Sequence, residues 1–220
     1  MIPGPFFNAC DYLLDRHVRE GRGDRLALTG VAGDVSYAEL AERVSRAARG
    51  LRGLGLQAEQ RVVMVMADSP EFVTVYLAAM RIGAVPVPIS TMLRADGIAE
   101  ILADSRARVV AVSSAYRDAV ASALGFPGVI EVMAVVTDAL LADAEDESDE
   151  IYPTTADSPT FWLYTSGTTG TSKGAMHRHG SVRVVCEIYG AQVLGITSTG
   201  KIRRVELRAQ AAVITQGAVS

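Results

Sequence analysis

The sequence predicts an α/β fold made of βαβ units with a largely parallel sheet. Short apolar runs of strand length alternate with segments whose apolar residues recur at helical spacing. The mean hydropathy of +0.22 is high, which favours strands buried on both faces. The chain has 220 residues, of which 49% are hydrophobic and 21% charged, so it suffices for one large domain or two small ones. This composition excludes a disordered chain, a collagen and a disulfide mini-protein.

A capping box, Ser36-Tyr-Ala-Glu39, marks the start of the first predicted helix. The Ser36 hydroxyl is suited to cap the backbone of Glu39, whose carboxylate reaches back. Apolar residues then recur at helical spacing: Leu40, Val44, Ala47, Ala48 and Leu51. Gly53 ends this run, and residues 61–66 (RVVMVM) then predict a buried strand.

The next helix is expected over residues 69–82, because Pro70 suits its first turn and a glycine follows its end. A short strand is expected over residues 85–89. This strand contains Pro86 and Pro88, which cannot donate to a sheet ladder. We therefore expect it to be brief or to lie at an edge of the sheet.

Helices and strands are expected to alternate from there. The predicted helices are 94–103 and 115–124, and the predicted strands are 109–113 and 129–136. A strand over residues 161–165 leads into a glycine-rich loop, and a helix over residues 178–194 follows.

Changes in composition along the chain predict four segments. Six of the 25 acidic residues lie within residues 143–150, just before a run of turn residues. The predicted segments are an α/β N-terminal subdomain (1–142), an acidic, turn-rich linker (143–160), a strand, loop and helix (161–196), and a C-terminal remnant with a tail (197–220).

The cysteines and the N-terminus predict a cytoplasmic protein. Cys10 and Cys186 form no disulfide framework or metal-ligand spacing, and both are interpreted as small buried apolar residues. Asp11 interrupts the N-terminal apolar stretch, and no positive charge precedes Arg16, so no secretory signal is expected. No apolar run approaches the roughly 18 residues that span a bilayer.

The charge distribution leaves two readings of the last quarter of the chain. The net charge is −4, and no nucleic-acid partner is expected. After Gly170, seven bases stand against two acids, either as a surface that faces phosphate or as a solvated helix face. The oligomeric state is left open.

The strongest functional signal is the segment from Tyr164 to Gly174, YTSGTTGTSKG. Its glycines allow a close backbone approach, its backbone N–H groups are suited to an anion-binding nest, and Lys173 adds a positive charge. Between a strand and a helix, such a loop suits phosphate oxygens. It is not a Walker A loop, because Lys173 stands between Ser172 and Gly174. The alternative is a flexible Ser/Thr/Gly linker.

This loop closely resembles the signature Y-T-S-G-T-T-G-x-P-K-G of the adenylate-forming (AMP-binding) enzymes, the superfamily of acyl- and aryl-CoA synthetases. Residues 161–164 (FWLY) and 177–180 (HRHG) resemble most the benzoate-CoA ligase branch. The resemblance covers about residues 5–196, with Ser172 where the family usually has proline. It implies an incomplete N-terminal part of the adenylate-forming ligase fold.

The resemblance also implies a reaction and a set of site residues. The family joins a carboxylate to Mg-ATP, which gives an acyl-adenylate and pyrophosphate, and coenzyme A then forms a thioester. The expected partners are therefore a small-molecule carboxylate of the aryl-acid type, ATP with magnesium, and coenzyme A. The expected phosphate-binding residues are Thr165, Ser166, Gly167, Thr168, Thr169, Gly170 and Lys173. His179 matches a common family histidine, with a helix-capping or packed histidine as the alternative; no protein metal site is expected.

Residues 197–208 (TSTGKIRRVELR) resemble the family's C-terminal motif T-x-T-G-K-I-x-R-x-x-L-R, with Lys201 as its catalytic lysine. The alternative is a basic surface helix. Because family members are more than twice as long, the chain resembles two ends of one enzyme joined by an internal deletion near residues 196 and 197. We therefore expect little or no complete turnover. The alternative function is a non-catalytic remnant with a weak ATP- or pyrophosphate-binding loop or a partner-binding role.

Overall fold

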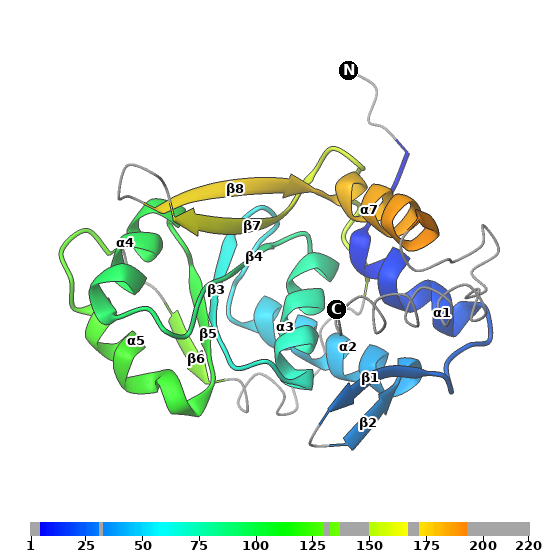
Figure 1. Cartoon of the computed structure of the whole chain (residues 1–220), viewed down its shortest axis with the longest axis horizontal. Coiled ribbons are helices and arrows are strands. Elements are labelled where there is room, and N and C mark those ends of the chain that lie inside the picture. The colour runs from blue at the N-terminus through cyan, green and yellow to red at the C-terminus, as the bar shows by residue number, and fades with distance from the viewer. Residues whose placement is uncertain (1–4, 31–32, 130–132, 137–149, 167–171, 193–220) are drawn as a thin grey trace, which may run out of the picture. The chain divides into compact units, whose positions relative to one another are not determined.

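The computed structural model describes residues 5–30, 33–129, 133–136, 150–166 and 172–192, and it confirms the α/β fold (Figure 1). The chain divides into two compact units, Met1–His179 and Gly180–Ser220, and the second is described only over residues 180–192. The predicted division into four segments stays a prediction.

A parallel four-stranded sheet forms the centre of the first unit, in the order β4-β3-β5-β6. Its strands are β3 (Arg61–Val65), β4 (Val85–Pro88), β5 (Val109–Val112) and β6 (Met133–Val136). All of β5 and the last four residues of β3 are buried, which confirms that the high hydropathy reflects strands covered on both faces.

Strand β4 lies at the edge of this sheet, as its prolines predicted. Val85 N–H donates to the Gln60 carbonyl (2.8 Å), and Ile89 N–H donates to the Met64 carbonyl (3.1 Å). Pro86 and Pro88 alternate with these donors, so the positions without an N–H group face away from β3.

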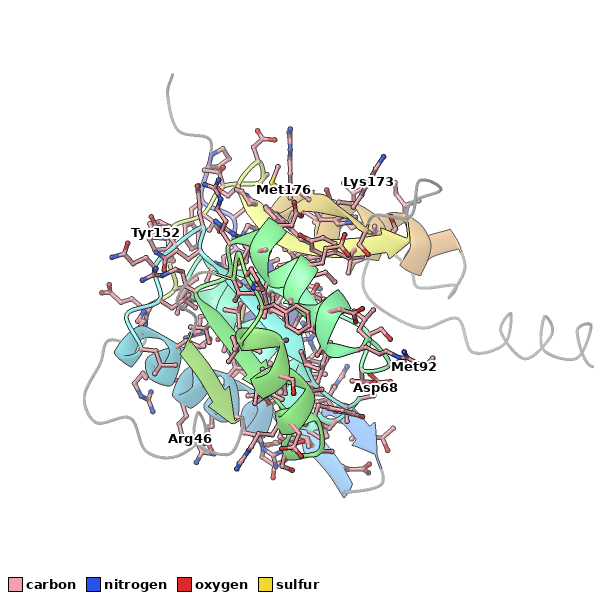
Figure 2. The ribbon with its side chains drawn as sticks, turned by 90° about the vertical axis from the view of Figure 1, so that its left-hand side faces the viewer. Arg46, Asp68, Met92, Tyr152, Lys173 and Met176 are labelled. Atoms are coloured by element: carbon pink, nitrogen blue, oxygen red, sulfur yellow. The ribbon has the colours of Figure 1, made fainter. Side chains whose placement is uncertain are left out.

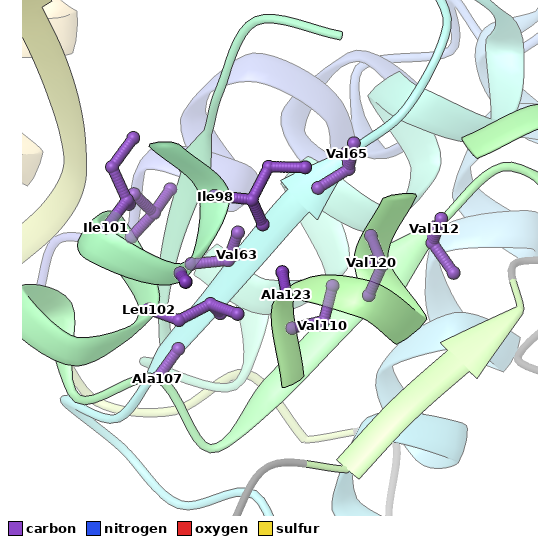
Figure 3. Close-up of a cluster of buried hydrophobic side chains, with 12 residues drawn as sticks. Val63, Val65, Ile98, Ile101, Leu102, Ala107, Val110, Val112, Val120 and Ala123 are labelled. Atoms are coloured by element: carbon purple, nitrogen blue, oxygen red, sulfur yellow. The ribbon is translucent and has the colours of Figure 1, made fainter. Parts of the chain in front are cut away.

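Helices cover both faces of the sheet, with α4 and α5 on one side and α2 and α3 on the other (Figure 1). Their bounds are α2 (Tyr37–Gly53), α3 (Pro70–Arg81), α4 (Ala95–Ser105) and α5 (Arg117–Leu124), the last preceded by a 3₁₀ turn, η2 (Ser114–Tyr116). The capping box is confirmed: Glu39 N–H donates to Ser36 Oγ (3.2 Å), and Ser36 N–H donates to Glu39 Oε2 (2.8 Å). Figure 3 shows the buried cluster that joins α4 and α5 to the sheet.

The N-terminal elements were not predicted from the sequence. A π-helical turn η1 (Asp11–Asp15) continues into α1 (Arg16–Arg19), and β1 (Leu26–Gly30) pairs antiparallel with β2 (Gly33–Ser36).

The predicted strand and helix on the two sides of the glycine-rich segment are confirmed, but a second strand between them was missed. Strand β7 (Pro159–Ser166) pairs antiparallel with a second strand, β8 (Ser172–Arg178), and helix α7 (His179–Gln192) begins only after it. The glycine-rich loop is therefore the connection of a β-hairpin. The sequence did not predict β8, because its residues, SKGAMHR, include no β-branched residue and no regular apolar alternation. Most of this strand is exposed, so it needs no apolar face.

The predicted linker over residues 143–160 is described only from residue 150. Tyr152 N–H donates to the Arg81 carbonyl (2.9 Å), and Phe7 N–H donates to the Thr154 carbonyl (2.8 Å). Gly83 leaves room for the Tyr152 ring, because a Cβ there would lie 2.5 Å from Tyr152 Cδ1. The described part of this segment is thus packed against the fold, and its role as a linker stays a prediction.

The two cysteines differ in burial. Cys10 is fully buried as expected, whereas Cys186 is exposed on α7, so that half of the prediction is wrong. Among the described residues, no helix combines the length and apolar character needed to cross a membrane.

Candidate functional site

The root of the glycine-rich loop is defined by the register of the β7–β8 hairpin. Thr165 lies opposite Lys173, and Ser166 lies opposite Ser172. Directly opposed residues of an antiparallel pair share a face, with Cβ atoms about 5 Å apart. The structure therefore places Thr165 and Lys173 side by side at the loop root, and both residues are exposed. Figure 2 shows Lys173 at the outer side of the hairpin.

The remaining predicted loop residues extend beyond this root. Gly167, Thr168, Thr169 and Gly170 lie outside the described residues, as does the predicted catalytic Lys201. Ser166 is described as part of β7, at the last paired position before the loop. Their roles stay predictions.

Aromatic contacts fix the hairpin against the edge of the central sheet. Trp162 packs against the buried cluster, and the Arg61 guanidinium lies 5.6 Å from its ring centroid. On the other face of β7, Phe161 lies between Tyr76 (5.9 Å) and His177 (4.4 Å). His177 is part of β8, directly opposite Phe161. Because residues alternate along a strand, both faces of β7 have aromatic neighbours that hold it in place.

Tyr164 is the residue at this root to which sequence reasoning assigned no role. Its hydroxyl donates a hydrogen bond to Asp104 Oδ2 of α4 (2.5 Å). Partial burial, followed by the bond to the Asp104 carboxylate, raises the pKa of Tyr164 above its usual value. Gly174 lies opposite, and a Cβ there would stand 3.1 Å from Tyr164 Cζ. Tyr164 and Gly174 are the two ends of the segment YTSGTTGTSKG, but the sequence alone carried no signal that they are cross-strand partners.

His179 lies at the other end of the hairpin. It lies six positions after Lys173, which corresponds to about 20 Å at a rise of ~3.3 Å per residue. Its ring is fully buried, and its Nδ1 accepts from Ala9 N–H (2.9 Å). The backbone N–H of His179 donates to the Ser158 carbonyl (3.0 Å), while the ring Nε2 has no hydrogen-bond partner among the described residues. Burial lowers its pKa to about 4, so the ring is neutral at pH 7. These contacts favour the packed alternative.

Among the residues that the structure describes, no group of three or more His, Cys, Asp or Glu is placed to hold a metal ion. This part of the chain therefore offers magnesium no cage of its own. Mg²⁺ is commonly held largely by the phosphates of its nucleotide, with few protein ligands.

Comparison with known proteins agrees with this geometry. The model of a family described as AMP-binding enzyme matches residues 14–205. The chain belongs to this family. The matched region of this AMP-binding chain includes the central sheet and the whole β7–β8 hairpin.

The benzoate-CoA ligase of Thauera aromatica is 37% identical to this AMP-binding chain over 198 residues, which is 86% of this chain and 37% of that ligase. A crystal structure of a benzoate CoA ligase from Burkholderia xenovorans LB400 matches with a TM-score of 0.77 and 31% identity, over 87% of this chain and 38% of that one. The anthranilate CoA ligase AuaEII, in complex with anthranoyl-AMP, matches with a TM-score of 0.78 and 26% identity, over 87% and 37% of the two chains. The chain thus spans less than two fifths of the length of these relatives.

Proposed function

We propose that this chain binds the phosphates of Mg-ATP at its β7–β8 loop, within the reaction of an AMP-forming carboxylic acid–CoA ligase. The observation that carries the proposal is the pairing of Thr165 with Lys173 at the root of a loop of five residues. A hydroxyl and an ammonium on one strand face, flanking a Gly/Thr loop, suit the oxygens of a polyphosphate.

In the proposed reaction, a carboxylate oxygen attacks the α-phosphorus of ATP. The bond between that phosphorus and the bridging oxygen breaks, so pyrophosphate leaves and an acyl-adenylate forms. Negative charge grows on the leaving pyrophosphate in this step. Lys173, held in advance by the hairpin, and the N–H groups expected of the loop would stabilise that charge more than the ground state. Magnesium, brought by ATP, would neutralise further charge on the phosphates.

The second half of the reaction and the acid substrate rest on the relatives. The sulfur of coenzyme A attacks the acyl carbon, the bond to the AMP oxygen breaks, and a thioester forms. Relatives named for benzoate and anthranilate support an aryl acid as the substrate class. A cytosolic location is part of the same proposal.

Replacement of Lys173 by alanine tests the phosphate site. We expect the Kd for Mg-ATP to rise about tenfold, the loss of one charge-assisted contact, with little change in stability because Lys173 is exposed. Isothermal titration calorimetry measures the first quantity and thermal unfolding the second.

Arg178→Ala is the matched control, since it removes one exposed base from the other end of β8. The Arg178–Asp157 pair (2.9 Å) is 62% and 85% exposed at its two side chains, so it contributes little to stability. We expect Mg-ATP binding to stay at the wild-type level in this variant. Equal losses in both variants, or none in Lys173→Ala, would contradict the proposal.

Complete turnover is a separate question, and the prediction of little or none stays open to test. Exchange of labelled pyrophosphate into ATP, with benzoate, hydroxybenzoates or fatty acids, measures the first half-reaction. Nucleotide binding without exchange on any acid supports the alternative of a remnant that keeps its polyphosphate loop. Exchange that requires an aryl acid supports a working ligase.

A further inference from the structure

The loop root is exposed, so something must hold its two strands in place while they meet a charged ligand. Within the described part of the chain, the Tyr164–Asp104 bond is the single side-chain hydrogen bond that links residues 164, 165 and 172–174 to another element. Both strands continue directly from this point to Thr165 and Lys173. A displacement of Tyr164 is therefore passed to both predicted phosphate contacts.

The acceptor of this bond lies on a rigid element. Ile101 and Leu102 of α4 are buried in the cluster shown in Figure 3, next to Asp104 in sequence. The Arg61 side chain donates to the Ser105 carbonyl (2.5 Å) and to the Arg106 carbonyl (3.3 Å), which ties the end of α4 to the first residue of β3. Asp104 thus presents its carboxylate from a fixed position.

Gly174 completes the arrangement on the opposite strand. A Cβ at this position would approach Tyr164 Cζ to 3.1 Å and the hydroxyl oxygen to 3.3 Å, closer than ordinary contact. A Cβ here would require the phenol to shift by a few tenths of an ångström, which strains its bond with Asp104. Gly174 leaves room for the ring that crosses it, and its φ is not positive.

We propose that Tyr164, Asp104 and Gly174 form an anchor that positions the root of the phosphate-binding loop for Mg-ATP. This inference rests on the proposed function, because it concerns the same site. These are positioning residues: they set where Thr165 and Lys173 stand and need not touch the nucleotide. A preorganised contact binds more tightly than one that the ligand itself must order.

The decisive comparison uses Asp104, because its charge and its bond predict opposite effects. A carboxylate close to a phosphate site repels the ligand. If Asp104 acts only through its charge, its removal would therefore tighten Mg-ATP binding. If Asp104 acts as an anchor, its removal would weaken binding. Asp104→Asn keeps an acceptor without the charge, and Asp104→Ala keeps neither. Glu100→Ala, one helical turn earlier on the same helix and exposed, is the matched charge control.

We expect Tyr164→Phe, which keeps the ring and loses only the hydroxyl, to raise the Kd for Mg-ATP about three- to tenfold. Asp104→Ala should raise the Kd by a similar factor, and the Tyr164→Phe/Asp104→Ala double variant should raise it no more than either single variant. The Kd of Asp104→Asn should stay within about twofold of wild type. The melting temperature without ligand should change by less than about 2 °C, because the bond is exposed. A lower melting temperature with unchanged Kd would overturn the proposal, as would tighter binding in all variants that remove a charge.

Gly174→Ala gives an independent test of the same anchor. It should weaken Mg-ATP binding as Tyr164→Phe does, because its methyl group displaces the ring. In a Tyr164→Ala background there is no ring to displace, so the added methyl should then have no further effect. An equal loss in both backgrounds would overturn the role of Gly174.

Hydrogen exchange without ligand separates this inference from the proposed function. If the wild type binds no Mg-ATP, the proposed function fails, and the anchor is tested by amide exchange alone. Tyr164→Phe should speed exchange at residues 165 and 172–174 while leaving β3 and β5 protected. Unchanged exchange at those residues would overturn the anchor.

Discussion

The two ends of the β7–β8 hairpin are held in different ways. At one end, His179 is fully buried and accepts a hydrogen bond from Ala9, 170 positions away in sequence. At the other end, Thr165 and Lys173 are exposed, and Tyr164 bonds to Asp104. The same pair of strands therefore has a buried end that contributes to stability and an open end that is accessible to a ligand.

The difference follows from what covers each end. The N-terminal segment lies over the His179 end, where Asn8 donates from its side-chain amide to the Met80 carbonyl (3.0 Å). The adjoining turn is fixed as well, because the Thr154 hydroxyl donates to the Phe7 carbonyl (2.7 Å). Long-range packing of this kind costs more to disturb than an exposed contact. Substitutions at the two ends should accordingly affect different measurements.

His179→Ala is the substitution with the largest expected effect. It removes a buried ring and leaves the Ala9 N–H without its acceptor, so we expect a loss of about 2–4 kcal/mol in unfolding free energy. The melting temperature should fall by about 5–15 °C. Denaturant titration measures the loss, and binding below the transition should show an unchanged Kd for Mg-ATP. A stable variant with weakened nucleotide binding would reverse the comparison between the two ends.

A smaller effect is expected from pH. Burial lowers the pKa of His179 to about 4 in the folded chain, against an ordinary value near 6.5 when unfolded. The unfolded chain therefore binds the extra proton first as the pH falls. The stability contributed by the neutral ring is fully present above about pH 6.5 and is lost between about pH 6.5 and 4, up to about 3 kcal/mol.

Unfolding free energies at pH 7.5 and pH 4.5 test this dependence. His179→Gln should remove most of the difference, because an amide does not titrate. His17→Gln is the control: burial also lowers the pKa of His17, but this ring is only partly buried. An equal pH dependence in wild type and His179→Gln would show that other groups cause it.

The central fold was predictable because its local and long-range signals agree. The capping box at Ser36, the helix start at Pro70 and the prolines of β4 each specify local geometry by themselves. The apolar runs then specify which elements lie inside. The N-terminal hairpin was missed, since residues 26–30 and 33–36 are mostly exposed and carry no clear alternation.

The candidate site could be proposed from its residue types, whereas its geometry could not be predicted. The lysine and hydroxyl residues of the loop indicated a phosphate site, but β8 was read as loop, because strand pairing with β7 and not its own residues makes it a strand. The place of His179 depends on Ala9, and the role of Tyr164 depends on Asp104. Such partners, distant in sequence, appear only once the chain is folded.

The most direct test of the account is thermal unfolding of the wild-type chain with and without Mg-ATP. At a nucleotide concentration about 100-fold above Kd, a ligand that binds only the folded state adds about 2.7 kcal/mol. We predict a cooperative transition that rises by about 5–10 °C, with a smaller rise in Lys173→Ala at the same concentration. A transition that stays in place at saturating Mg-ATP and pyrophosphate would contradict the assignment of the open end of the hairpin as a phosphate site.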